Sequence, residues 1–227
     1  MPGTIQPVEP PMSAINRMSP PLRLVPADGE ERRRVDAELV FALKRGDHAA
    51  AEAIWDRYAP RVQRFLLRSL GLPEEEVEDL TQEVFIRIFT SSRAIREPGA
   101  LRKFVMSVAV RVLQSELRRR RVRRWVRLAD DGCPPDVIAE GGINPEARQA
   151  LKRCYEILNE LGIRERTAFA LRFLEGMTLD EVASQLRVSL STAKRLVNRS
   201  TALVSAAVGG DEDLRGYFAD EKAIDDR

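Results

Sequence analysis

Six polar side chains between positions 191 and 199 have the types and spacing that suit contacts with DNA. They are Ser191, Thr192, Lys194, Arg195, Asn198 and Arg199. Arginine, lysine and asparagine donate hydrogen bonds to base edges in the major groove and to phosphates. At helical spacing these six share an outer face, while Ala193, Val197 and Val204 fall on the inner face. The pattern predicts a DNA-binding helix; an ordinary helical hairpin with a solvated basic face is the alternative.

Residues 179–200 have the signals of a helix–turn–helix in which that helix is the second. Thr178 and Glu181 match a capping box at the start of the first helix, and Ser189 can cap the second. The small residue Ala183 falls where the two helices cross. Arg187 occupies the turn position at which glycine is usual, because glycine tolerates positive φ. This motif favours docking of the second helix in a DNA groove.

A second group of cationic side chains ends a predicted helix that begins near Gly99. It comprises Arg118, Arg119, Arg120, Arg121, Arg123, Arg124 and Arg127, with Trp125 among them. Like charges on successive helical turns repel each other, and a polyanion relieves that repulsion. Trp125 offers a stacking surface for an exposed base. The group therefore predicts nucleic-acid contact; the alternatives are a solvated helix end and a tryptophan at the edge of the core.

A predicted helix after Pro73 has one acidic face. That face carries Glu78, Asp79, Gln82 and Glu83. The buried stripe of the same helix is Val77, Leu80, Val84 and Ile88. Acidic residues near a helix start also stabilise the helix dipole, which is the simpler interpretation of this face when it is taken alone.

The remaining composition argues against catalysis. Cys133 and Cys154 fit no zinc or redox spacing, and His48 is the single histidine of the chain, so we expect no metal site and no catalytic triad. No glycine-rich phosphate loop is present, and we expect no cofactor. No apolar stretch is long enough to span a membrane, and the Pro-rich N-terminus does not resemble a secretory signal. A cytoplasmic protein without enzymatic activity is predicted.

The elements that must position these residues form an all-α fold with two small helical modules. We expect a disordered Pro-rich tail over 1–35, a first module over 36–127 and a flexible acidic linker over 128–145. The second module, over 146–208, ends in the helix–turn–helix, and an acidic, frayed tail follows over 209–227. Within the first module, Asp36 and Asp47 are predicted N-caps, and Pro60 predicts a kink or break.

Taken together, these motifs resemble those of bacterial sigma factors of the extracytoplasmic-function (ECF) group. Residues 78–87 (EDLTQEVFIR) are similar to the region-two motif that docks on the β′ clamp of RNA polymerase. Residues 104–121 resemble the helix that reads the −10 element, which implies roles for Arg111, Gln114 and the arginines at 118, 119, 120 and 121. Residues 164–178 resemble the start of region four, and 180–199 the helix that reads the −35 element. The resemblance covers roughly 36–205.

The resemblance implies a promoter-specificity subunit that binds core RNA polymerase, at the β′ clamp and the β flap, together with promoter DNA. An anti-sigma factor is a further candidate partner. The sequence departs from the usual family pattern at Val110–Val112 and at Arg195–Leu196, which bears on the promoter sequence that is read. A stand-alone helix–turn–helix regulator is one alternative, and an interaction protein that does not bind DNA is another.

Overall fold

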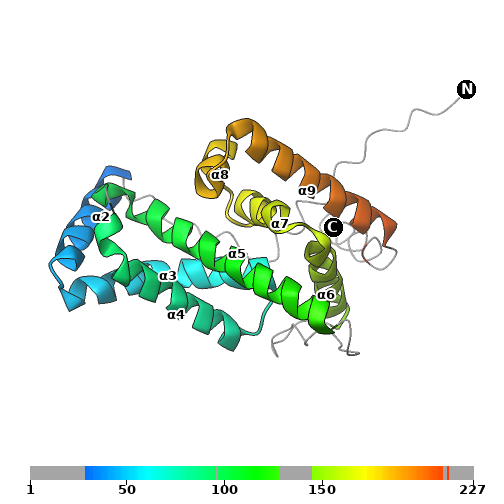
Figure 1. The fold of residues 1–227 in the computed structure, drawn as a ribbon, viewed down its shortest axis with the longest axis horizontal. Coiled ribbons are helices and arrows are strands. Elements are labelled where there is room, and N and C mark those ends of the chain that lie inside the picture. The colour runs from blue at the N-terminus through cyan, green and yellow to red at the C-terminus, as the bar shows by residue number, and fades with distance from the viewer. Residues whose placement is uncertain (1–28, 96, 128–144, 212–213, 215–227) are drawn as a thin grey trace, which may run out of the picture.

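The computed structural model describes residues 29–95, 97–127, 145–211 and Leu214 of the 227 residues. Every regular element in these ranges is a helix, as the sequence predicted. Most of the Pro-rich tail, the acidic linker and most of the acidic C-terminal tail lie outside the described residues. The chain forms two groups of helices in sequence order, which we call module one (29–127) and module two (145–214) (Figure 1).

Module one is built from four α-helices and two short 3₁₀ helices. They are α2 (Gly29–Lys44), α3 (His48–Leu70), α4 (Glu74–Thr90), η1 (Ser92–Ala94), η2 (Pro98–Ala100) and α5 (Leu101–Arg127). The predicted cap of α3 is confirmed, since Asp47 Oδ1 accepts a hydrogen bond from the Ala49 amide at 2.9 Å. At the other end of α3, Gly71 adopts a left-handed conformation with φ 66° and donates its amide to Leu67 O. This cap turns the chain into α4.

Asp36 is not a helix cap, contrary to the sequence-based prediction. Helix α2 already begins at Gly29, so Asp36 lies in its interior and is only 4% exposed. Its carboxylate accepts a hydrogen bond from the Tyr58 hydroxyl at 2.6 Å and pairs with Arg57 at 3.2 Å. Burial, and then this hydrogen bond, raise the pKa of the Tyr58 phenol. Asp36 therefore fastens α2 to α3 instead of starting a helix.

Pro60 does not break α3, which runs without interruption from His48 to Leu70. A proline in a helix removes one backbone hydrogen bond and leaves a carbonyl in the preceding turn without its donor. Pro60 lies on the exposed side of α3, where water can reach that carbonyl. The neighbouring buried residues, Ala59 and Val62, continue the packing of α3 against the core.

Module two contains four α-helices and one π-helical segment. They are α6 (Pro145–Glu160), α7 (Ile163–Phe169), η3 (Ala170–Leu174, π-helical), α8 (Leu179–Leu186) and α9 (Leu190–Gly210). The capping box is confirmed: Thr178 N donates to Glu181 Oε2 at 2.8 Å and Glu181 N to Thr178 Oγ1 at 3.2 Å. Arg187 ends α8 with φ 53° and ψ 50°, the left-handed conformation that the predicted turn requires.

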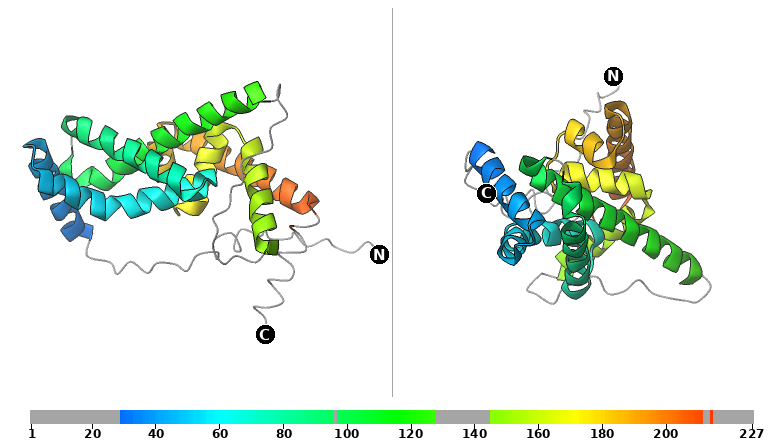
Figure 2. Two further views of the ribbon diagram at one scale, coloured as in Figure 1. Left: turned by 90° about the horizontal axis from the view of Figure 1, so that it is seen from below. Right: turned by 60° about the vertical axis from the view of Figure 1, so that its left-hand side comes forward.

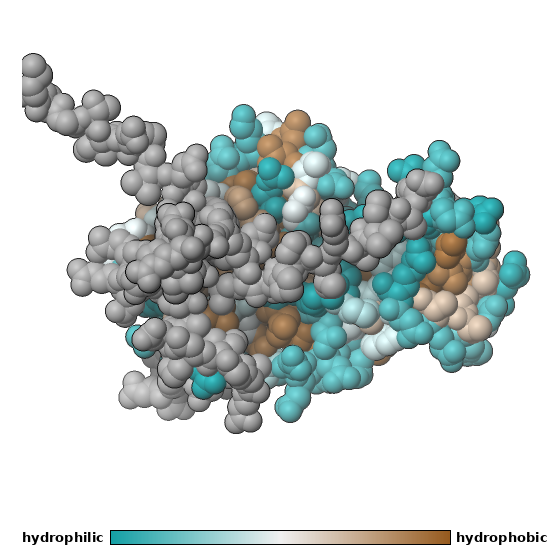
Figure 3. All heavy atoms as spheres, turned by 180° about the vertical axis from the view of Figure 1, so that it is seen from behind, coloured by the Kyte–Doolittle hydropathy of each residue, from teal (hydrophilic) through white to brown (hydrophobic). Residues whose placement is uncertain are grey.

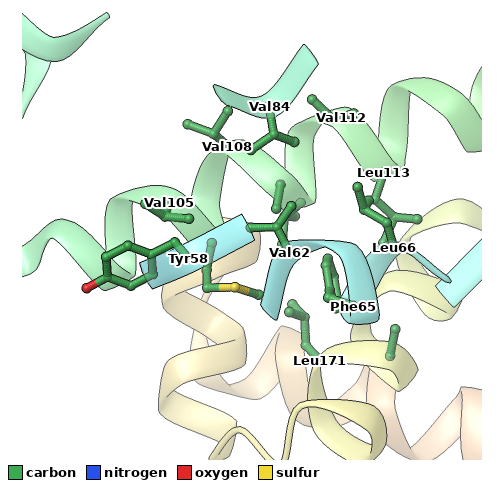
Figure 4. Close-up of a cluster of buried hydrophobic side chains, with 14 of the residues drawn as sticks. Tyr58, Val62, Phe65, Leu66, Val84, Val105, Val108, Val112, Leu113 and Leu171 are labelled. Carbon is green, nitrogen blue, oxygen red and sulfur yellow. The ribbon is translucent and has the colours of Figure 1, made fainter. Parts of the chain in front are cut away.

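The two modules share one hydrophobic core. Leu171 of module two lies next to Phe65 of α3, in a cluster that also contains side chains of α4 and α5 (Figure 4). A smaller cluster in module two includes Leu214, which is 0% exposed. The prediction of a frayed tail from 209 onward was therefore wrong for its first residues, because α9 continues to Gly210 and Leu214 packs on the core.

The surface carries the charged residues that the composition indicated. Seen from behind, the described part is mainly hydrophilic, and hydrophobic side chains show only as small patches (Figure 3). The carboxyl-terminal half of α5, which carries the arginine group, projects from the body of the molecule (Figure 2). Among the described residues, none of the helices combines the length and the apolar character that a membrane crossing requires.

Candidate nucleic-acid interface

The face of α9 predicted to read DNA is exposed, and the helix is held from beneath. Its exposed residues are Ser191, Lys194, Arg195, Asn198 and Arg199, and Thr192 is half-buried. Ala193, Val197 and Val204 are buried against the rest of module two, as their spacing predicted. The buried side fixes the direction of the helix, so that its long polar side chains project into solvent on one face.

Two of the six predicted residues belong to the helix cap. Ser189 Oγ accepts a hydrogen bond from the Thr192 amide at 3.3 Å. The same hydroxyl lies 3.0 Å from Ser191 Oγ and 2.9 Å from Thr192 Oγ1. The positive end of the α9 dipole is therefore surrounded by hydroxyl groups, a combination that suits a phosphate. Arg199 lies 3.9 Å from Glu165 and is 70% exposed, so this pair leaves its guanidinium accessible.

The predicted −10 residues follow α5 over its central and carboxyl-terminal turns. Arg111, Arg118, Arg119 and Arg121 are exposed, whereas Gln114 and Arg120 are half-buried. Arg111 Nε donates to Ser107 O at 3.1 Å, which orients its guanidinium along the helix. Burial, then the cations Arg187 and Arg87, lower the pKa of Arg111. Positive charge from α4, α5 and the helix–turn–helix thus meets at this point.

The sequence-based reasoning missed the buried acid beneath the arginine group. Glu116 is 5% exposed and pairs with Arg119 at 3.6 Å, Arg120 at 2.8 Å and Arg123 at 2.7 Å. The three arginines follow Glu116 by three, four and seven residues, so they lie on the same face of the helix as Glu116. This signal was present in the sequence. Within the described residues, Arg118 and Arg121 take part in no ion pair. Among the arginines of the group whose side chains the structure describes, these two are the best placed for phosphate contacts.

The acidic face of α4 divides into exposed residues and one that is already paired. Glu78, Asp79 and Gln82 are exposed, and the predicted stripe Val77, Leu80, Val84 and Ile88 is buried. Glu83 is half-buried and pairs with Arg87 at 2.5 Å and with Arg119 at 3.9 Å. Ile86, one turn after Gln82, is 62% exposed, and the sequence-based analysis did not single it out. Ile86 thus adds one exposed apolar side chain to the acidic face.

Nothing in the described residues forms an evident reaction centre. They contain no cluster of three or more His, Cys, Asp or Glu side chains able to hold a metal ion. Burial raises the pKa of the Cys154 thiol to about 11, so at neutral pH this sulfur is protonated and weakly nucleophilic. The side chains of Arg124, Trp125 and Arg127, and Cys133, lie outside the described residues, and base stacking by Trp125 stays a prediction.

Two protein-family models match the chain, one on each module. The Sigma-70 region 2 model matches residues 54–123, and the Sigma-70, region 4 model matches residues 147–202. Together they span more than half of the 227 residues. The first match includes most of α5, and the second includes the predicted DNA-binding face of α9.

Comparisons with individual proteins agree with the two family models. The ECF RNA polymerase sigma factor SigE of Mycolicibacterium smegmatis is 28% identical over 186 residues, which covers 77% of this chain and 65% of that protein. The structure of CnrH in complex with the cytosolic domain of CnrY matches at a TM-score of 0.55 and 20% identity, over 78% of this chain and 99% of that one. The sigma factor RpoE in complex with the anti-sigma factor NepR, from Bartonella quintana, matches at 0.53 and 20% identity, over 71% and 98%. At these identities the two structures establish the fold.

Proposed function

Because the chain belongs to the ECF group of RNA polymerase sigma factors, we propose that it directs core RNA polymerase to promoters through three separate faces. The α4 face binds core polymerase, the α5 face binds the −10 element and the α9 face binds the −35 element. The protein acts with polymerase in the cytoplasm. Polymerase performs the chemistry, and this chain supplies recognition.

The α4 face suits a protein partner. Glu78, Asp79 and Gln82 supply exposed acceptors and a donor, and Ile86 adds an apolar contact at the next turn. An exposed apolar residue surrounded by polar groups can supply much of the binding energy of an interface. Glu83 has a different role in this proposal: paired with Arg87 and Arg119, it holds α4 against the arginine group. By family resemblance the partner surface is the β′ clamp, and module two contacts the β flap.

The α5 face suits a DNA backbone. Arg118 and Arg121 are exposed cations that phosphates can neutralise with release of counterions. Arg111 and Gln114 lie nearer the body of the molecule, where they can contact bases or sugars of the −10 element. Glu116 fixes Arg119, Arg120 and Arg123, so that these cationic side chains occupy defined positions along the helix.

The observation that carries the proposal is the exposed face of α9 on a capped helix–turn–helix. Lys194, Arg195 and Asn198 are exposed on a helix whose opposite side is buried, and they can enter a major groove together. A stand-alone regulator would use the same face, but it leaves the α4 face without a role. We also propose an anti-sigma factor as a partner, because both structural relatives are complexes and the partner of RpoE is named as one.

The test is a pair of single variants that separate the two activities. Arg195→Ala should weaken binding to a pool of promoter fragments about tenfold and leave core polymerase binding unchanged, since one base or phosphate contact is lost. Asp79→Ala should show the reverse pattern. Electrophoretic mobility shift and pull-down with bacterial core polymerase measure the two activities.

The matched control is Arg64→Ala, which removes an exposed helical arginine of module one outside the three faces. It should leave both activities unchanged. Equal loss of DNA and core binding in Arg195→Ala would contradict the assignment of separate faces.

A further inference from the structure

We propose that Glu165 of α7 is a positioning residue that directs the Arg199 side chain toward the −35 element. This inference rests on the proposed function, because Arg199 belongs to the α9 face assigned to that element. Glu165 comes from a different helix, and its side chain is only 19% exposed. In this proposal Glu165 touches no DNA and acts through the one arginine that it holds.

The ion pair leaves the outer end of the Arg199 guanidinium available. Arg199 Nε lies 3.9 Å from Glu165 Oε1, while most of the Arg199 side chain is exposed. Among the described residues, Arg199 has no second ion-pair partner. An arginine held at Nε keeps its two terminal nitrogens, Nη1 and Nη2, for the paired hydrogen bonds that arginine donates to guanine or to a phosphate. The pair therefore limits the direction of the side chain without blocking its recognition group.

Glu165 has a fixed origin because it lies on a helix that is anchored in the core. It belongs to the first turn of α7, where the helix dipole favours an acid. The four residues that follow it are buried, and α7 packs directly against α9. Movement of the carboxylate relative to α9 is therefore limited to rotation of its own side chain.

Gly162, the N-cap of α7, makes room for that carboxylate. A Cβ at Gly162 would collide with Glu165 Oε2, whereas it would lie 3.5 Å from Oε1, the oxygen nearer Arg199. The backbone of Gly162, with φ −60° and ψ 152°, is open to every L-residue, so glycine is not required by the conformation. Its missing side chain lets Glu165 fold over the helix start, with one oxygen toward Gly162 and the other toward Arg199.

Without Glu165, Arg199 would remain cationic but would lose its preferred direction. A long side chain that is ordered before binding loses less conformational freedom when it binds. The carboxylate also repels phosphates, so it disfavours binding that is not sequence-specific. Both effects act on the ratio of specific to non-specific affinity. They contribute little to stability, because an exposed ion pair adds little to folding.

The test compares binding of the holoenzyme to one promoter fragment and to the same fragment with the base pairs of its −35 element shuffled. The holoenzyme contains the full chain and bacterial core polymerase, and the fragment comes from a genomic pool. Glu165→Gln should lower the ratio of the two affinities about three- to fivefold, less than the roughly tenfold effect of Arg199→Ala. Gly162→Ala keeps every charge and displaces only the flexible end of Glu165, so the ratio should fall by a similar factor. In both variants Tm should stay within about 3 °C of the original.

Two controls separate positioning from a general effect of charge. Glu156→Gln removes an acid of module two that pairs with the exposed Arg153 at 2.6 Å, and it should leave the ratio unchanged. In the double variant Glu165→Gln with Arg199→Ala, the ratio should equal that of Arg199→Ala alone, because Glu165 acts through Arg199. A further loss in the double variant, or an unchanged ratio in either Glu165→Gln or Gly162→Ala, would overturn the proposal.

A second measurement needs no DNA. Nuclear magnetic resonance relaxation of arginine side chains in the free protein reports how strongly each Nε–H group is ordered. The order parameter of Arg199 should exceed that of Arg195, an exposed arginine one turn earlier on α9, and should fall to the Arg195 value in Gly162→Ala. Equal order parameters in the original protein would overturn the proposal. A holoenzyme that does not distinguish the two fragments would instead contradict the proposed function, while the order parameters would still decide whether Glu165 holds Arg199.

Discussion

Arg187 joins the two helices of the helix–turn–helix at a cost in backbone conformation. It is the only non-glycine residue with positive φ among the described residues, at 53°. A Cβ in the left-handed region is unfavourable by about 1 kcal/mol relative to glycine. After burial, the positive charge of Arg187 is the next largest cause of the lowered pKa of Arg111, so the two cations repel each other. A residue that is unfavourable in two respects indicates a role outside stability, and DNA contact is the role that its position suggests.

Arg187→Gly should stabilise the free protein and weaken DNA binding. We expect the free energy of unfolding to rise by about 0.5 to 1 kcal/mol, and Tm by about 1 to 4 °C, because glycine removes the strain. Thermal unfolding followed by circular dichroism measures this.

The comparison for that variant is Arg45→Gly, whose backbone φ is not positive. There glycine relieves no strain and only increases the freedom of the unfolded chain, so Tm should fall slightly. If Arg187→Gly also lowered Tm, the left-handed conformation of Arg187 would not be a source of strain.

At the scale of elements, one buried acid offsets the positive charge within α5. Glu116 bears the ion pairs of three arginines, while the exposed Glu76 adds a link from α4 to Arg120 at 2.7 Å. Without Glu116, three arginines of one helix would repel each other with no acid between them, whereas the exposed Glu76 pair contributes little. The projecting half of α5 thus keeps its helical form despite the density of positive charge along it.

Glu116→Gln should therefore destabilise the protein by about 1 kcal/mol, because three ion pairs of a few tenths of a kcal/mol each are lost, and Glu76→Gln by less than about 0.5 kcal/mol. Glu76 is the matched comparison, because its side chain is 49% exposed and contacts the same Arg120. Urea unfolding of the two variants at one ionic strength measures both values. Similar losses in the two would show that burial of Glu116 does not determine the stability of α5.

Most elements of the fold could be predicted from local sequence signals. The caps at Asp47, Thr178 and Ser189 lie where side-chain chemistry placed them, because a cap depends on residues within one turn. Asp36 was assigned wrongly because its partner, Tyr58, is 22 positions away. The same limit explains the module contact: Arg166 and Ser69 are 97 positions apart, and neither has a local signal.

The candidate faces were predictable for a similar reason. Spacing on one helix decides which side chains lie together, so the exposed residues of α4, α5 and α9 could be grouped from sequence alone. What spacing does not reveal is which of them are already paired. Within the described residues, Glu83 and Arg120 are engaged in ion pairs, whereas Asp79 and Arg118 take part in none. Assignment of roles to single residues therefore required the structure.

At the scale of the whole molecule, the proposed recognition faces and the contact between the modules involve different residues. The three faces are at the surface, and the module contact is buried between them, with Leu171 seated against α3 (Figure 4).

In vitro transcription with bacterial core polymerase on a pool of genomic promoter fragments tests the central claim most directly. Discrete start sites should appear only when this protein is added, and Asp79→Ala and Arg195→Ala should each reduce them, while Arg64→Ala should not. The fragments transcribed should share two sequence elements near −10 and −35. Core binding without any start site, or start sites that persist unchanged in both variants, would contradict the assignment of this chain as a promoter-directing sigma factor that uses these faces.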